Sequence, residues 1–319
     1  MSNLEARPAE TECHGDATGA AETLAPREVP LGGPRAMTVR RTLPHRDRRM
    51  VGAWCFVDHY GPDSVHDGGM FVPPHPHTGL QTVSWLLSGE VLHHDSLGSE
   101  QVIRPGQLNL MTAGRGIAHA EVTPTASSEQ LHGVQLWVAL PSGSRDTAPA
   151  FEHHAELPTV SLPGGVATVI VGDFAGVRSA ATTFTELLGV ELALGAGADV
   201  EVPVRPDHEH ALLALDEDVT IGEAAVSHGA LHYLPPGPNE IRVRAMRASR
   251  VLLLGGLPFE ETVVMWWNFL GTDHDTIAAA RADWESSSPR FGEVPGYDSR
   301  LAAPALPGTR LKARGRQRN

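Results

Sequence analysis

The chain has 319 residues, 41% of them hydrophobic, which is enough to bury the core of one large domain or of two ordinary ones. Its 25 basic and 38 acidic residues give a formal charge of −13, which argues against nucleic acid or an anionic membrane as the main partner. The 33 glycines and 25 prolines favour short strands joined by tight turns.

The first 35 residues are rich in Ala, Glu and Pro and show little hydrophobic periodicity, so we expect a disordered or loosely packed arm over 1–35. This segment lacks the apolar core of a signal peptide, and no stretch of the chain approaches the roughly 20 apolar residues of a membrane-spanning helix. Cys13 and Cys55 are too few for a disulfide framework. These features indicate a cytoplasmic protein without a membrane partner.

Residues 36–145 contain short apolar stretches, such as AWCFVDHY, QTVSWLLS and GVQLWVAL, bounded by Gly, Pro, Ser or Asp. Helical spacing is not sustained there, so the pattern predicts an antiparallel β-barrel or sandwich. The passage LPSGSRDTAPAFEHH then resembles a linker, and strand-like runs resume over 146–300. Two β-rich halves of similar size predict a duplicated barrel in an all-β fold.

The end of the second half differs from the rest. HDTIAAARADWESS has the composition of a short helix, with Asp275 as its expected N-cap. The segment 301–319 ends in TRLKARGRQRN, which has five basic residues and no apolar pattern. We expect a flexible, solvated tail rather than a nucleic-acid-binding arm.

The residues that point to chemistry are two pairs spaced two apart, His75 with His77 and His119 with Glu121. Residues i and i+2 of a strand face the same side, about 6.6 Å apart. If the two pairs meet across a sheet, they supply three imidazole nitrogens and one carboxylate oxygen, which suit a borderline divalent metal. For a six-coordinate ion this leaves two positions for substrate, water or O₂. A His-x-His pair alone is more often an exposed strand or loop; the second pair favours the metal site.

The segments VDHYGP, HPHTGLQTVSWLLSGEVLHHDSLGS, IRPGQLNLMTAGRGIAHAE and MWWNFLGTDHDTIAAARADW resemble the signatures of the pirin family of bicupins, over about residues 36 to 295. The resemblance implies two stacked cupin-type antiparallel β-barrels with a short C-terminal helix. It also implies one Fe(II) ion in the N-terminal barrel, 36–145, and a metal-free barrel over 146–300. The implied ligands are His75, His77, His119 and Glu121, and other divalent metals could bind them.

One part of the motif departs from the family. Many pirins have His-Pro-His-Arg-Gly-Phe-Glu-Thr-Val, whereas this chain has Thr78, Leu80 and Gln81. The glutamate that Gln81 replaces is not a metal ligand in the family, so the ligand set is retained. The lining of the pocket mouth, and with it the substrate preference, is where we expect the difference to act.

Other polar residues near the two pairs have weaker signals. His93 and His94 are neighbours on an expected strand, so at most one can face the barrel interior. Arg115 lies just ahead of His119 and could hydrogen-bond a group that orients it. His208-x-His210 has no matching His-x-Glu, so we interpret it as structural.

Asp58, His59 and Tyr60 interrupt an apolar run, which favours a pocket-rim or packing role, and Met111 is expected in the core. His153, His154 and His274 are expected to be loop or cap residues.

The resemblance leaves two functions open. The first is a quercetin 2,3-dioxygenase-type oxidoreductase that cleaves flavonol-like enols with O₂, in which Glu121 serves as both ligand and catalytic base. The alternative is an iron- or redox-responsive regulator that binds a transcription factor or metabolic enzyme without turnover. A third reading is a decayed cupin whose iron is only structural. In each case we expect a monomer, with a small aromatic substrate or a protein as its partner.

Overall fold

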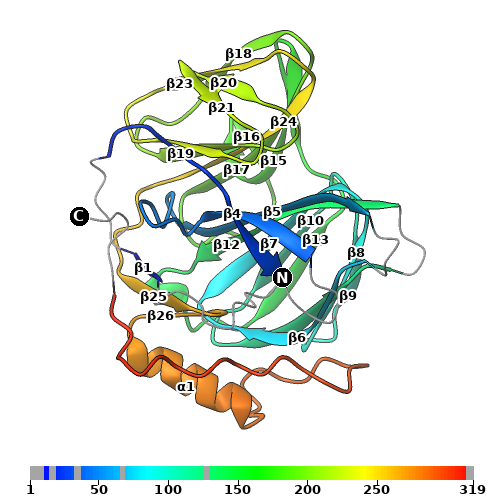
Figure 1. Cartoon of the computed structure of the whole chain (residues 1–319), viewed down its shortest axis with the longest axis vertical. Coiled ribbons are helices and arrows are strands. Elements are labelled where there is room, and N and C mark those ends of the chain that lie inside the picture. The colour runs from blue at the N-terminus through cyan, green and yellow to red at the C-terminus, as the bar shows by residue number, and fades with distance from the viewer. Residues whose placement is uncertain (1–10, 14–18, 32–36, 65–68, 125–128, 314–319) are drawn as a thin grey trace.

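The computed structural model describes residues 11–13, 19–31, 37–64, 69–124 and 129–313. Figure 1 shows two β-barrels stacked along the long axis, with one helix at the far end of the N-terminal barrel. Among the described residues no helix is long and apolar enough to span a membrane. The all-β, two-barrel fold with a short C-terminal helix is therefore as predicted.

The N-terminal barrel consists of a seven-stranded sheet, in the order β13-β10-β7-β12-β5-β4-β3, and a four-stranded sheet, in the order β6-β11-β8-β9. Their strands are β3 (Arg27–Leu31), β4 (Met37–Leu43), β5 (Trp54–Ser64), β6 (Phe71–His77), β7 (Leu80–Ser88), β8 (Val91–Asp95), β9 (Glu100–Ile103), β10 (Leu108–Thr112), β11 (Ile117–Val122), β12 (Gln130–Ala139) and β13 (Ala150–His154). A 3-10 turn, η1 (Ser142–Ser144), precedes β13.

The C-terminal barrel pairs an eight-stranded sheet, in the order β14-β15-β17-β24-β19-β22-β2 with β16 on β15, with the four-stranded sheet β18-β23-β20-β21. Its strands are β2 (Glu22–Leu24), β14 (Thr159–Leu162), β15 (Gly165–Phe174), β16 (Val177–Arg178), β17 (Leu187–Leu194), β18 (Ala198–Pro203), β19 (Glu209–Ala214), β20 (Val219–Ile221), β21 (Ala224–Val226), β22 (Leu231–Leu234), β23 (Glu240–Ala245) and β24 (Ser249–Gly256).

The N-terminal arm is more ordered than expected. Strand β2 adds to β22 at the edge of the C-terminal barrel, and β3 adds to β4 at the edge of the N-terminal barrel. Leu24 and Val29 are buried by this pairing. The prediction of a loose arm is therefore wrong for residues 22–31, because edge strands with free backbone groups accept these segments as additional strands. Residues 1–10, 14–18 and 32–36 lie outside the described part of the chain.

The boundary between the halves also differs from the prediction. Strand β13, expected in a linker and second barrel, pairs with β10 and completes the first barrel's larger sheet. After the second barrel the chain returns to the first, where β1 (Thr11–Cys13), β25 (Val263–Trp266) and β26 (Phe269–Gly271) form a small sheet next to α1 (His274–Glu285). Figure 1 shows β25 and β26 at the side of the first barrel, with α1 at the end of the molecule. Residues 263–285 therefore belong spatially to the first barrel.

Helix α1 and the residues after it cover the outer side of the β6–β11 sheet. The N-cap of α1 is Asp273, whose side chain accepts a hydrogen bond from the Thr276 N–H, so the expected cap at Asp275 is wrong by two residues. Ile277, Ala280 and Trp284 pack in one cluster with Ala118 and Ala120 of β11. The apolar side chains on the outer side of β11 are thereby buried.

The tail also packs on this layer. The Leu301 N–H donates to the Pro74 carbonyl, and the Leu311 side chain is buried. The predicted flexible tail is therefore wrong at least for residues 301–311, whereas 314–319 lie outside the described residues.

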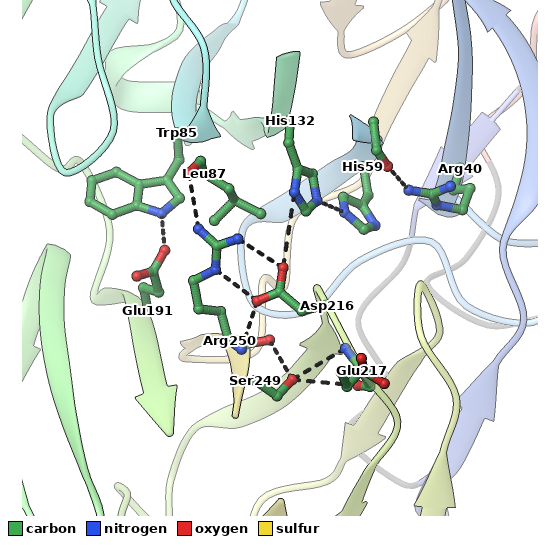
Figure 2. Close-up of polar contacts among 11 residues, drawn as sticks. Arg40, His59, Trp85, Leu87, His132, Glu191, Asp216, Glu217, Ser249 and Arg250 are labelled. Atoms are coloured by element: carbon green, nitrogen blue, oxygen red, sulfur yellow. Dashed lines mark hydrogen bonds and ion pairs between the residues drawn. The ribbon is translucent and has the colours of Figure 1, made fainter. Parts of the chain in front are cut away.

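Polar side chains join the two barrels across β7. Because side chains alternate along a strand, Ser84 faces the first barrel's interior and Trp85 faces the second barrel. The Trp85 indole N–H donates to Glu191 at 2.7 Å, and Arg250 forms a two-bond ion pair with Asp216. Arg250 also donates to the Leu87 carbonyl, as Figure 2 shows.

Candidate metal centre

His75, His77 and His119 meet inside the first barrel, whereas Glu121 is grouped with His119 and His93 rather than with His75 and His77. Strands β6 and β11 are antiparallel, with His75 directly opposite His119 and a bulge between His119 and Glu121. The bulge adds a residue on one strand, which changes the direction of the side chains that follow it. His75, His77 and His119 are fully buried, and Glu121 is 2% exposed.

His119 is common to two groups of potential ligands. His75, His77 and His119 each offer a nitrogen within 4.8 Å of the others, and so do the donor atoms of His93, His119 and Glu121. The Nε2 atoms of His77 and His119 are 3.1 Å apart. Ligand nitrogens at about 2.1 Å from one ion and at right angles to each other would be about 3.0 Å apart. The spacing therefore fits two nitrogens directed at one cation.

His75 is held in the tautomer that a metal needs. Its Nδ1 lies 2.9 Å from the Pro73 carbonyl, which can only accept, so Nδ1 carries the proton and Nε2 has a free lone pair. That Nε2 atom is buried and has no hydrogen-bond partner. A buried, unpartnered ring nitrogen facing other imidazoles fits a cation ligand.

Burial lowers the pKa of all three histidines well below the usual value. The positive charge that His75 would carry lowers the pKa of His77 and His119 further. Neutral imidazole is the form that binds a metal, so the interior keeps the three rings ready for a cation.

Ser84 of β7 lies beside Glu121 and can donate its one hydroxyl proton either to Glu121 or to Gln135 of β12. The Ser84 hydroxyl lies 2.9 Å from Gln135 Oε1 and 3.4 Å from Glu121 Oε1. Burial and the neighbouring Glu121 both raise the pKa of Tyr60, so its hydroxyl stays protonated. Neither Ser84 nor Gln135 was expected at the site from the sequence. The β7–β12 register, which the structure decides, places the two residues opposite each other.

His93 is the inward-facing member of its pair, as the alternation of a strand requires. Its Nδ1 lies 3.4 Å from His119 Nδ1, and its Nε2 lies 3.1 Å from Asp95 Oδ2. His94 points outward and bonds the Tyr297 hydroxyl. Asp95 was not expected at the site, although it lies two residues from His93 and so faces the same side.

Arg115 does not orient His119 through its side chain, which is exposed. Its backbone N–H donates to the Thr147 carbonyl, and its carbonyl accepts from Arg290 Nε. That expectation was wrong because the turn at Arg115 points away from the barrel interior, whereas β8 runs beside β11 and places His93 next to His119.

None of the departures from the family motif is a candidate ligand, although Thr78 directly follows His77. The Gln81 amide donates to the Thr112 hydroxyl and to the Thr182 carbonyl, on the side of β7 that faces the second barrel. Leu80 is buried in the hydrophobic core, and Thr78 forms a backbone bridge with Phe269. A glutamate at 81 could not donate to the Thr182 carbonyl, which explains why an amide stands there.

The remaining candidates lie elsewhere. Among the described residues, groups of three or more potential metal ligands occur only in the first barrel. His208 and His210 are buried in the second barrel. His153 lies in β13 rather than in a loop and bonds the Asn109 side chain at 2.7 Å, so the loop prediction for His153 and His154 was wrong. Asp58 forms a buried ion pair with Arg41, in agreement with a packing role.

The chain matches the sequence profile of pirin over residues 36–138 and that of the pirin C-terminal cupin domain over residues 189–292. It belongs to the pirin family. All four candidate ligands fall within the first matched range. The predicted family and its two-domain cupin-type fold are therefore confirmed.

Two relatives and one solved structure are similar to this pirin-family chain. A Pseudomonas aeruginosa protein provisionally named quercetin 2,3-dioxygenase is 41% identical over 312 residues, 96% of this chain and 98% of the relative. A pirin-like protein of Caulobacter vibrioides is 36% identical over 264 residues, 80% and 91% of the two chains. The crystal structure of quercetin 2,3-dioxygenase from Acinetobacter baumannii, at 41% identity, superposes with a TM-score of 0.88 and covers 92% of this chain and 98% of that one.

Proposed function

We propose that this pirin-family protein binds one Fe(II) ion in its first barrel through His75, His77, His119 and Glu121. The observation that carries the proposal is the convergence of three neutral, buried imidazoles, with the unpartnered Nε2 of His75 facing the others. Three imidazoles and one carboxylate suit a borderline divalent metal and leave part of its coordination sphere open. The choice of iron over other divalent ions rests on the family resemblance.

We further propose a quercetin 2,3-dioxygenase-type oxidoreductase acting on a flavonol-like enol and O₂, as the names of the two 41%-identical proteins suggest for those proteins. The ion would supply Lewis acidity and redox chemistry towards O₂. Glu121 would accept the proton of the enol hydroxyl, since the neighbouring Tyr60 stays protonated. The Ser84 hydroxyl, which can donate its one proton to Glu121 or to Gln135, would lie beside the Glu121 carboxylate.

The burial of the ligands favours a second candidate function. Two cavities, of about 660 and 400 Å³, lie near Trp284 and near His208, and neither is lined by the four candidate ligands. A metal enclosed in this way suits a regulator that senses iron or its oxidation state and binds a protein partner without turnover. In either case we propose a cytoplasmic monomer.

The test is anaerobic reconstitution with Fe(II), addition of quercetin, and then admission of O₂. We expect iron-dependent loss of the flavonol absorbance with formation of a ring-opened product. The His77→Ala variant, reconstituted in parallel, should show neither. A wild-type protein that holds iron but neither binds nor consumes quercetin would overturn the enzyme proposal and favour the regulator.

A further inference from the structure

Asp95 contacts His93, and His93 contacts His119. In the β8–β11 pairing, Asp95 lies opposite His119 and His93 lies opposite Glu121, so the four side chains share the inner face of the sheet. Asp95 Oδ1 accepts from the backbone N–H groups of Leu97 and Ser99, at 2.9 and 3.0 Å. These two bonds fix the carboxylate, and its other oxygen, Oδ2, faces His93 at 3.1 Å.

The direction of each hydrogen bond follows from Asp95. A carboxylate can only accept, so the proton between it and His93 lies on His93 Nε2. In a neutral His93 the other nitrogen, Nδ1, is then an acceptor. It faces His119 Nδ1 at 3.4 Å, so the proton of His119 lies on Nδ1. The lone pair of His119 is left on Nε2, which faces His77.

The His93 ring has little freedom to turn. It stacks on Phe151 of β13, with ring centroids 4.4 Å apart and planes 14° from parallel. His93 is also 3% exposed, so water does not compete for its nitrogens. Strand β13, at the edge of the first barrel's larger sheet, thereby supplies the surface that holds this ring.

We propose that Asp95 and His93 are positioning residues that fix the tautomer of His119, so that its Nε2 lone pair is presented to the cation. The proposal rests on the metal site proposed above and extends it by two residues. The opposite tautomer would direct an N–H at the cation and would have to convert before binding. Partners of this kind, behind metal-bound histidines, typically contribute about 10- to 100-fold in metal affinity.

The alternative role for His93 is that of a direct ligand, because its donor atoms also lie within reach of His119 and Glu121. The contacts favour the positioning role. One ring nitrogen of His93 is directed at Asp95 and the other at His119, so neither is free for a cation.

The Asp95→Asn variant tests the direction of the bonds. The Leu97 and Ser99 N–H groups will retain the amide oxygen, so the amide NH₂ will face His93. His93 Nε2 must then accept, His93 Nδ1 must donate, and His119 must carry its proton on Nε2. One substitution is thus expected to reverse every proton position along the line without changing its shape.

The measurement is the tautomer of His119 in the metal-free, full-length protein, read from long-range ¹H–¹⁵N correlations of the imidazole rings and assigned by their loss in His119→Gln. We expect the Nδ1–H form in the wild type and the Nε2–H form in Asp95→Asn. Co(II), used as the probe ion, should bind the variant about 10- to 100-fold more weakly. The matched control is His94→Gln, the outward neighbour, which should leave both readouts unchanged.

A second variant keeps the test decisive if Asp95→Asn does not fold. His93→Phe retains a ring that can stack on Phe151 but removes the acceptor for His119, so a mixture of His119 tautomers is expected. An unchanged His119 tautomer in either folded variant would overturn the positioning role. Loss of Co(II) binding by His93→Phe, with an unchanged His119 tautomer, would indicate that His93 is a direct ligand instead. If the wild type binds no ion but shows the expected tautomers, the metal proposal fails, whereas the control of the His119 tautomer by Asp95 and His93 is supported.

Discussion

The Nε2 atoms of His77 and His119 approach to 3.1 Å inside the first barrel, although the two residues belong to different strands. Both rings are fully buried and their pKa values are lowered by burial. Two lone pairs at this distance repel each other unless a proton or a cation lies between them. The pair therefore explains why this position in the fold favours a bound ion.

Removal of one ligand should abolish metal binding. We expect His77→Ala and Glu121→Ala, purified after Fe(II) loading, to lose nearly all of the roughly one equivalent held by the wild type. Metal content by mass spectrometry measures this, with His94→Ala as a control for the loss of a histidine outside the site. Full retention by both variants would show that the ligand set is wrong.

Gln81 should contribute to stability rather than to the metal site. Gln81→Glu places a buried carboxylate against the Thr182 carbonyl and loses the amide donor, so we expect a loss of about 1–3 kcal/mol in the free energy of unfolding. Urea unfolding of the metal-free protein measures the change. Gln107→Glu is the matched control, because its side-chain oxygen already accepts from the Arg104 N–H. Equal stability of the two variants would contradict the structural role of Gln81.

The bond between Trp85 and Glu191 should stabilise the joint between the barrels. Glu191→Leu leaves the buried indole N–H unpaired, which should lower the free energy of unfolding by about 1–3 kcal/mol. Glu191→Gln retains an oxygen acceptor and is expected to lose much less. Thermal melting of the three proteins distinguishes them, and a similar loss in both variants would point to charge rather than to the indole bond.

The histidines at the same joint should make the fold sensitive to acid. The Nε2 atoms of His59 and His132 lie 2.8 Å apart. Figure 2 draws this contact as a dashed line. Burial lowers the pKa of His59 to about 2 and that of His132 to about 4, and the positive charges of Arg40 and Arg250 add to the effect. His228 lowers both values further, whereas Asp216 raises that of His132.

Both pKa values lie below the usual value of 6.5, so the unfolded chain takes up protons first. The contribution of these two histidines to the free energy of unfolding should be fully present above about pH 6.5. The free energy of unfolding should fall as the pH decreases towards 4, by up to about 1.4 kcal/mol per pH unit for each histidine. Urea unfolding between pH 8 and 4.5 measures this slope. The double variant His59→Asn, His132→Asn should show a shallower slope than the wild type, and an identical slope would mean that these two groups do not set it.

Much of the candidate centre follows from the spacing of residues along strands. His75 with His77, and His119 with Glu121, share a face because a strand repeats every two residues, and this holds in any sheet. The same rule predicts that only one of His93 and His94 faces inward. The position of Gln81 on the side opposite Ser84 is a further consequence of this rule, but which side faces the second barrel depends on the packing of the two barrels.

The sequence by itself determined the strand-rich composition, the two β halves and the four donors with their alternation. Only the tertiary structure decided which strands are neighbours. Backbone N–H and C=O groups are the same at nearly every residue, so two strands can pair whatever their separation along the chain. It brings β8 beside β11, so that Asp95 and His93 stand behind His119. It also keeps β13 in the first barrel and takes the segment after β24 back to that barrel, where an edge strand and an apolar face are available to pair and pack.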